Sequence, residues 1–315
     1  MRVISRSLSL WIFLVVSVIW GLTWIAIKVG VEATPPLFFA GARFVAAGGL
    51  LLLFMYRRID WRGIGKHWRA LLAISALMTT LAYGLAFWGM QHTPSGVAAV
   101  VNLSMTPLSL FVMGLALRAE TFSRRKVVGV VVGLLGLMVL FWPELRSGKE
   151  SEAAGLLALV AGTLVYCLAS VLSRRWLAAL DIVTMSGSVM LIGGIGLALL
   201  SALVEPLSGA TLVALLQPAP LASWLFLIIC GSIVAFTLYL YLLRVWGPTR
   251  AGLYAFVSPI VALIAGAVVL GERIEPIQAV GACILIVAAA IGVGGDPFMR
   301  AESAAPQSAE DHRER

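Results

Sequence analysis

The chain contains 315 residues, of which 61% are hydrophobic and only 12% are charged, and its formal net charge is +8. Soluble domains average about half apolar and a quarter charged residues, so the composition excludes a soluble globular domain and indicates an integral membrane protein. The basic residues lie in short loops between apolar runs, where they indicate topology rather than contact with nucleic acid.

Ten mostly apolar segments are each long enough to cross about 30 Å of hydrocarbon. Backbone groups inside a bilayer must pair within the protein, so such segments are helices or barrel strands, and their length without strict alternation favours helices. The predicted spans are 10–29, 37–56, 70–90, 95–117, 127–142, 154–172, 183–203, 221–243, 249–270 and 277–294. The first is too long for the apolar part of a signal peptide, so we expect it to be retained.

Basic residues predict the orientation of these spans. Of the 23 lysines and arginines, eighteen fall on the side of the N-terminus, four fall on the other side, and Arg43 lies within a span. Cytoplasmic loops are enriched in Lys and Arg. Both termini are therefore predicted to be cytoplasmic.

The chain repeats itself at a constant offset of 152 residues, which relates Pro107 to Pro259 and Glu120 to Glu272. Each copy contains five predicted spans, an odd number, so the second copy should enter the membrane inverted relative to the first. Transporters are commonly built from two such repeats, with a site near the bilayer midplane. The pattern therefore favours a carrier.

The repeat divides the chain into four parts. Residues 8–142 form the first predicted five-helix repeat and residues 154–295 the second. Residues 143–153, which are polar and contain proline and glycine, form a predicted extracytoplasmic linker. Residues 296–315 have little apolar content and are predicted to be a disordered cytoplasmic tail.

The matched prolines are predicted to interrupt two of the helices at their centres. A proline removes one backbone donor and clashes with the carbonyl four residues earlier, here Leu103 or Ala255. A freed carbonyl needs a partner in lipid, so these helices should face protein or a wet cavity. Pro107 and Pro259 are candidate hinges; alternatively, they bend the helices only to improve packing.

Candidate substrate-binding residues surround these prolines. Asn102 and Tyr254 occupy equivalent positions in the two copies, where an amide and a phenol suit a small polar or amphipathic molecule. The other candidates lie on neighbouring spans and are Trp20, Thr23, Tyr83, Trp88, Tyr166, Tyr239 and Tyr241. The alternative for each aromatic residue is an anchor at headgroup depth, where Trp and Tyr concentrate.

Arg43 is the one formally charged residue well inside a predicted span. A charge at a helix centre costs about 2.5–3.5 kcal/mol on insertion scales. Arg43 could therefore extend to the outer headgroups or pair with Glu32. It could equally attract anions at an outer mouth.

The fifth predicted span carries Gly129, Gly133 and Gly136 along one face. Small residues at this spacing let helix backbones approach closely. Packing within the chain is favoured over dimerisation, and the oligomeric state is left open between monomer and homodimer.

Other functional classes find little support. All fifteen Asp and Glu residues fall in loops, at span ends or in the tail, so the buried carboxylate relay of proton-driven pumps is missing. This absence favours facilitated diffusion or exchange. The histidines are not placed for intramembrane catalysis, and the cysteines lack metal-ligand spacing, so we expect no enzyme, metal or cofactor. A channel-like permease remains the alternative.

Longer motifs occur in both copies: the first copy carries IWGLTWIAIKVG, PPLFFAGARF and TPSGVAAVVNLSMTPL, and the second carries GPTRAGLYAFVSPIVALIAGAVVLGERI. With these motifs the chain resembles the EamA-type branch of the drug/metabolite transporter superfamily. The resemblance implies two five-helix bundles around a central cavity, in a secondary transporter of the bacterial inner membrane. It further implies export of small metabolites, such as amino acids or amphipathic compounds, by alternating access.

Overall fold

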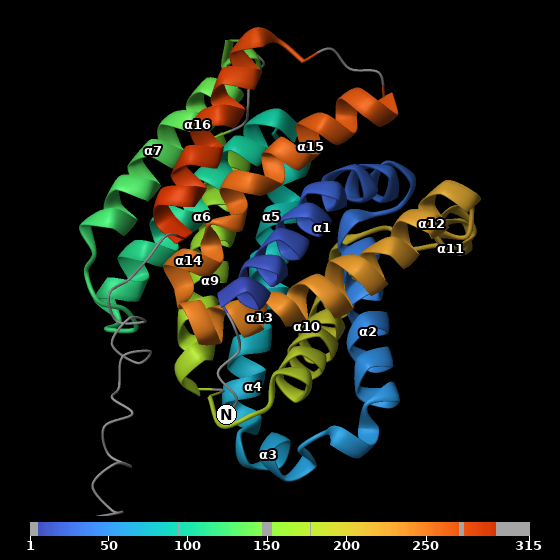
Figure 1. Ribbon diagram of the computed structural model, residues 1–315. Helices are drawn as coiled ribbons and strands as arrows, with labels where there is room; N and C mark the ends of the chain where they lie inside the picture. The colour runs from blue at the N-terminus through green and yellow to red at the C-terminus, as the bar shows by residue number, and fades with distance from the viewer. Residues whose placement is uncertain (1–5, 94, 147–152, 177, 271–273, 294–315) are drawn as a thin grey trace, which may run out of the picture.

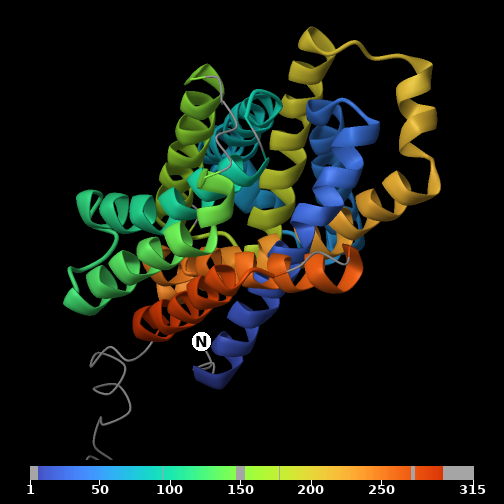
Figure 2. The ribbon, with the colours of Figure 1, turned by 90° about the horizontal axis from the view of Figure 1, so that it is seen from above.

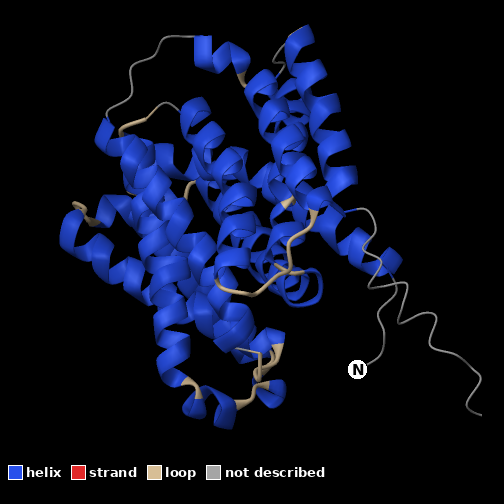
Figure 3. Cartoon of the chain, turned by 90° about the vertical axis from the view of Figure 1, so that its left-hand side faces the viewer, coloured by secondary structure: helices blue, strands red, loops and turns tan. Residues whose placement is uncertain are grey.

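The computed structural model describes residues 6–93, 95–146, 153–176, 178–270 and 274–293. These residues form helices and connecting loops without a strand (Figure 3). The predicted tail at 296–315 and most of the predicted linker at 143–153 lie outside the described residues. The described start of that linker belongs to a short helix rather than an extended segment.

The helices follow one another in two series, which we call the first half (residues 6–146) and the second half (residues 153–293). The first half contains α1 (Arg6–Ala33), α2 (Pro36–Phe54), η1 (Tyr56–Arg58), α3 (Trp61–Lys66), α4 (Trp68–Ser75), η2 (Ala76–Leu81), α5 (Ala82–Gln91), α6 (Ser95–Ala116), α7 (Arg124–Leu140) and α8 (Trp142–Arg146). The second half contains α9 (Ala153–Trp176), α10 (Ile182–Val204), α11 (Gly209–Leu215), α12 (Pro218–Phe226), η3 (Leu227–Val234), α13 (Ala235–Trp246), α14 (Pro248–Gly252), α15 (Tyr254–Leu270) and α16 (Pro276–Val293).

Eight helical stretches of the described chain are long and apolar enough to cross a membrane, and they coincide with eight of the ten predicted spans. The other two predictions fall on α6, whose apolar stretch covers Val101–Ala116, and on α7, a helix of 17 residues. The all-α membrane class is confirmed. The crossing of the membrane by α6 and α7, and hence the ten-span topology, stays a prediction.

The helices continue through both prolines, which differs from the predicted interruption at these positions. Pro107 lies inside α6 and Pro259 inside α15. The break in the second half comes earlier, at Leu253 between α14 and α15. A single missing donor is tolerated because neighbouring side chains and local adjustments can satisfy the backbone of membrane helices. The Thr106 hydroxyl beside Pro107 donates to the carbonyl of Asn102, 2.7 Å away, rather than to the freed Leu103 carbonyl.

Two helix pairs join the halves: α2 packs along α10, and α7 packs along α16 (Figure 1). Seen from above, the two pairs lie well apart in the molecule (Figure 2). Glycines allow the close approach. A Cβ atom on Gly48 would lie 2.4 Å from the Leu191 nitrogen, and one on Gly281 would lie 2.4 Å from the Leu140 nitrogen.

The glycine face of α7 packs within the chain, as predicted. Gly129 approaches the Gly292 backbone, Gly133 approaches the Phe256 ring, and Gly136 approaches Leu285. All three neighbours belong to the second half.

Polar contacts join the first half to α10 near both ends of that helix. At one end the Glu205 carboxylate accepts hydrogen bonds from the backbone amides of Leu37 and Phe38, each 2.8 Å long. These amides belong to the first turn of α2 and have no partner within the helix. Beyond the other end of α2, the amide of Asp60, which precedes α3, donates to the Thr184 hydroxyl of α10 over 3.1 Å. Polar contacts thus join the halves near both ends of α10.

Candidate functional site

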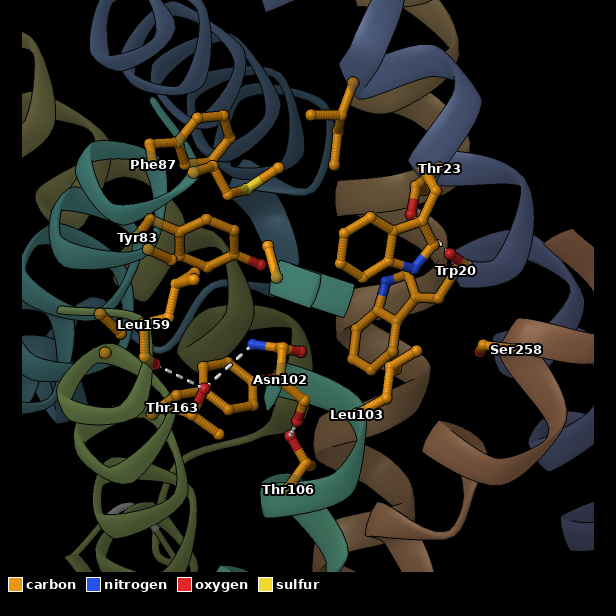
Figure 4. A pocket seen from close by; sticks show the side chains of 18 of the residues that line it. Trp20, Thr23, Tyr83, Phe87, Asn102, Leu103, Thr106, Leu159, Thr163 and Ser258 are labelled. Atoms are coloured by element: carbon orange, nitrogen blue, oxygen red, sulfur yellow. Dashed lines mark hydrogen bonds between the residues drawn. The ribbon is translucent and has the colours of Figure 1, made fainter. Parts of the chain in front are cut away.

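A cavity of about 150 Å³ lies between the two halves of the molecule. Its wall is formed by α1, α2, α5 and α6 of the first half and by α9, η3 and α15 of the second. Six predicted binding residues line it: Trp20, Thr23, Tyr83, Asn102, Tyr166 and Tyr254. The structure thus brings together side chains from five helices that are far apart in the sequence (Figure 4).

Aromatic rings pack against one another at one side of the cavity. The Trp20 and Tyr254 rings meet edge to face, with their centroids 4.4 Å apart. Tyr239, which is fully buried, packs behind them at 5.0 Å from Trp20 and 5.7 Å from Tyr254. Its hydroxyl donates to Ser170 over 3.2 Å. Tyr239 therefore supports the cavity wall from behind, and is absent from the lining itself.

Hydrogen bonds hold the polar side chains of the wall in place. The Asn102 amide donates to the Thr163 hydroxyl over 3.1 Å, and Thr163 donates to the Leu159 carbonyl over 2.9 Å (Figure 4). On the opposite side, the Trp20 indole donates to the Gly231 carbonyl over 3.2 Å. These bonds preorganise the amide and the indole before any ligand enters.

Arg43 lies in the wall of this cavity rather than at an outer mouth. Its side chain is only 4% exposed. The guanidinium carbon lies 4.3 Å from the Phe44 ring centroid and 5.7 Å from that of Tyr83. The buried Nε has no hydrogen-bond partner among the described residues. No interaction between Arg43 and Glu32 is observed, and Glu32 lines a second, neighbouring cavity.

Besides Tyr239, two predicted residues, Trp88 and Tyr241, are not in the cavity wall. Trp88 is 43% exposed and its ring lies 4.5 Å from that of His92, as expected for the alternative of an interface anchor. Tyr241 is partly buried and packs against the hydrophobic core, where its hydroxyl has no partner among the described residues. Both residues have the right chemistry but do not line the cavity.

Several lining residues were not among the predictions, including Trp24, Phe87, Met90, Leu103 and Thr163. Trp24 lies four positions after Trp20, so helical spacing alone could have placed it on the same face. The apolar residues carry no comparable signal, because most residues of these spans are apolar.

A second cavity of about 600 Å³ adjoins the first and shares the Trp24, Phe87 and Leu103 side chains with it. Lys28, Glu32 and the candidate hinge Pro259 lie in its wall. Pro107 is buried and lines neither cavity. Lys28 belongs to the side that the basic-residue distribution predicts to be extracytoplasmic. If this orientation holds, the second cavity lies toward that side of the membrane.

The halves also meet at Glu120, in the loop after α6. One carboxylate oxygen accepts from the Thr249 amide over 2.8 Å, and the other accepts from the Thr249 hydroxyl over 2.5 Å. Lys126 pairs with the same carboxylate at 3.0 Å, and the Glu120 side chain is only 4% exposed. We call Glu120, Lys126 and Thr249 the Glu120 cluster. The equivalent Glu272 lies outside the described residues.

The turn at Gly247 makes the Glu120 cluster possible. Gly247 has φ +82°, a left-handed conformation that favours glycine. A Cβ atom there would lie 2.5 Å from a Glu120 carboxylate oxygen. Both the backbone conformation and the close approach therefore require glycine.

A helical membrane protein with a polar-aromatic cavity between two halves has the architecture of a membrane transporter. The model of the EamA-like transporter family matches residues 7–142 and 153–293. The chain belongs to the EamA-like transporter family. The membrane bilayer and a small-molecule substrate follow from this membership.

Similar proteins agree with this assignment. The chain is 33% identical over 274 residues to the uncharacterised inner membrane transporter YedA of Escherichia coli, covering 83% of this chain and 82% of that one. It is 28% identical over 273 residues to the uncharacterised transporter YoaV of Bacillus subtilis, covering 86% and 91%. The chain is thus a multi-pass protein of the bacterial inner membrane.

Two further comparisons extend the similarity. Protein PecM of Dickeya dadantii is 28% identical over 296 residues, which cover 93% of this chain and 95% of that one. A crystal structure of a protein with 19% sequence identity superposes with a TM-score of 0.77, covering 96% of this chain and all of the other. At this identity the superposition shows the fold alone.

Proposed function

We propose that the protein is a secondary transporter that exports small metabolites by alternating access. The observation that carries this proposal is a cavity that is lined by both halves and adjoins a larger cavity, in a molecule whose halves also meet at the Glu120 cluster. A carrier needs a site that opens to one side at a time, with movable contacts between the halves.

The helix contacts support two inverted five-helix repeats, 8–142 and 154–295, within this carrier. The second predicted span of the first half, α2, packs against the second span of the second half, α10. The fifth spans, α7 and α16, pack against each other in the same way. The packing of α1 on α15 is repeated by α6 on α9. Contacts of this kind are expected when a two-fold axis relates the halves.

The third predicted span of each half contains a similar helical irregularity, which gives further support to the repeat. Each contains a π-helical segment, η2 in the first half and η3 in the second. Such segments in α-helices are frequent at functional sites. Gly231 of η3 lines the cavity, and Ala82 directly follows η2 in the opposite wall.

The basic-residue distribution places the Glu120 cluster on the cytoplasmic side. The conformation described here then corresponds to a transporter that is open outward and closed inward. Release of Thr249 from Glu120 would separate the halves on the cytoplasmic side. Pro107 and Pro259 serve in this proposal as hinges for the movement of α6 and α15.

The cavity wall contains no Asp or Glu within the described parts of the chain. A carboxylate that takes up and releases a proton at the site is therefore not among the lining residues. This composition favours exchange or facilitated transport of the metabolite over proton coupling through a buried acid.

Counterflow in proteoliposomes tests the proposed function. Vesicles with the purified full chain are loaded with an unlabelled solute, and entry of the same radiolabelled solute is followed across a panel of amino acids, organic acids and amines. A carrier gives transient accumulation of the label above equilibrium for at least one solute. If every solute of the panel enters empty vesicles equally fast, the proposal is contradicted. Single-channel currents in planar bilayers would show that the protein is a channel rather than a carrier.

A further inference from the structure

Arg43 places an uncompensated positive charge in the cavity wall. Among the described residues, no Asp or Glu lines the cavity or interacts with the Arg43 guanidinium. Its neighbours are the Phe44 ring and Tyr83, which lies within electrostatic reach. Rings stabilise a cation through their faces by about 0.5–2 kcal/mol, and the Tyr83 hydroxyl is a polar neighbour of the guanidinium, but neither group carries a negative charge.

A buried charge without an opposite charge beside it is costly, and a buried arginine is normally paired with a carboxylate. The in-plane N–H groups of a guanidinium match the oxygens of a carboxylate, phosphate or sulfonate. The buried Nε of Arg43 is one such donor that lacks an acceptor among the described residues. A group that can supply the acceptor has access, because Arg43 lies in the cavity lining.

The size and lining of the cavity restrict the rest of the ligand. A protein cavity of about 150 Å³ holds one benzene-sized ring, and the volume here is about 150 Å³. Trp20, Tyr166 and Tyr254 present ring surfaces to this space. Offset and edge-to-face contacts with such rings favour a flat apolar body.

We propose that the central site binds a small organic monoanion, with the anionic group on Arg43 and a single-ring apolar body among Trp20, Tyr166 and Tyr254. This inference rests on the proposed function for its role in transport. Cations find no carboxylate in the described lining and meet the Arg43 charge. The neighbouring cavity carries Lys28 and Glu32, one charge of each sign, and so does not reverse this preference.

Four probes with the same phenyl ring test the substrate class: phenylacetate, phenylacetamide, phenethylammonium and phenylalanine. Their binding to the purified full chain in detergent is measured by isothermal titration calorimetry. Phenylacetate is expected to bind at least about 10-fold more tightly than the neutral amide, since a hydrogen bond to a charged group is worth about one to two powers of ten. If phenylacetate binds no more tightly than phenylacetamide, the proposal is overturned, and this test needs no variant. Tighter binding of phenethylammonium or phenylalanine overturns it as well.

Variants then test whether Arg43 causes the preference for the anion. Arg43→Gln should reduce the affinity for phenylacetate by about 10-fold or more and leave that for phenylacetamide within about 3-fold, because only the anion uses the charge. Arg43→Lys keeps the charge and should retain part of the preference. Arg69→Gln, on the exposed surface of α4, is the matched control and should change neither affinity. An unchanged preference in folded Arg43→Gln overturns the assignment to Arg43.

Counterflow separates this proposal from the proposed function. Transport of panel solutes without preferential anion binding contradicts the substrate class alone. Arg43-dependent binding of phenylacetate without counterflow of any solute contradicts the carrier function and leaves the site standing.

Discussion

Glu120 and Thr249 are 129 positions apart, yet the backbone amide and the hydroxyl of Thr249 both donate to the Glu120 carboxylate, over 2.8 and 2.5 Å. The amide belongs to the start of α14, where backbone donors have no partner within the helix. The contact therefore satisfies Thr249 and joins the two halves at the same time.

Glu120→Gln should open the molecule on the Glu120 side. The change removes the charge that pairs with buried Lys126, and loss of one partner of a buried pair costs about 3–5 kcal/mol. Cys167 is buried behind the cavity, where its thiol donates to the Thr106 carbonyl. In a Cys230→Ser/Cys283→Ser background, alkylation of Cys167 by N-ethylmaleimide should become at least about 10-fold faster.

Glu205→Gln is the control for this experiment, because Glu205 also connects the halves but lies at the α2–α10 end. It should lower thermal stability without speeding the alkylation of Cys167. Equal alkylation rates for Glu120→Gln and the parent would show that Glu120 does not hold this side of the molecule closed.

Gly247→Ala should weaken the same contact through the backbone. Left-handed backbone costs a non-glycine residue about 1–2 kcal/mol, and the new Cβ atom would lie 2.5 Å from the Glu120 oxygen. A lower midpoint of thermal unfolding is expected. Gly209→Ala is the matched change, since a Cβ atom there has no neighbour within 4 Å, and its midpoint should stay near that of the parent.

Adjacent glycines of α2 test the packing between the halves. Gly48→Ala inserts a methyl group 2.4 Å from the Leu191 nitrogen, and overpacking of this kind costs about 1–3 kcal/mol. Gly49→Ala meets no atom within 4 Å and should be neutral or stabilising by up to about 1 kcal/mol through helix propensity. Unfolding in SDS titrations measures both. A loss of stability in Gly49→Ala as large as in Gly48→Ala would contradict the described α2–α10 contact.

Asn102→Ala should reduce transport several-fold at unchanged membrane abundance. The amide lies in the cavity wall and is held by Thr163, so its loss removes a positioned polar group. Tyr254→Phe, measured in the same assay, tests whether the phenol hydroxyl contributes to transport. Trp88→Phe, outside the cavity, should leave initial rates of uptake unchanged. Normal rates for Asn102→Ala at normal abundance would assign Asn102 to packing.

The repeat offset alone relates Asn102 to Tyr254, and both line the cavity together with Trp20, which is a candidate by its residue type on a neighbouring span. The sequence could not separate these residues from Trp88 and Tyr241, which have the same chemistry. The distinction depends on how each helix is rotated about its axis, and a uniformly apolar span carries little periodicity to show it.

Other features depend on contacts across the chain. Glu120 was recognised as a marker of the repeat, but its binding of Thr249 requires the turn at Gly247, which no local pattern indicates. The π-helical segments η2 and η3 have no proline or glycine signal in common. The prolines were expected to break α6 and α15, whereas the surrounding helices hold them continuous.

Cross-linking of the Glu120 side tests the central claim most directly. A Glu120→Cys/Thr249→Cys chain without its native cysteines is reconstituted, and counterflow is compared before and after treatment with a short thiol-reactive cross-linker and after its reductive cleavage. Alternating access predicts that cross-linking stops counterflow and that cleavage restores it. Counterflow that continues at the same rate in fully cross-linked protein would contradict movement of the two halves at this contact.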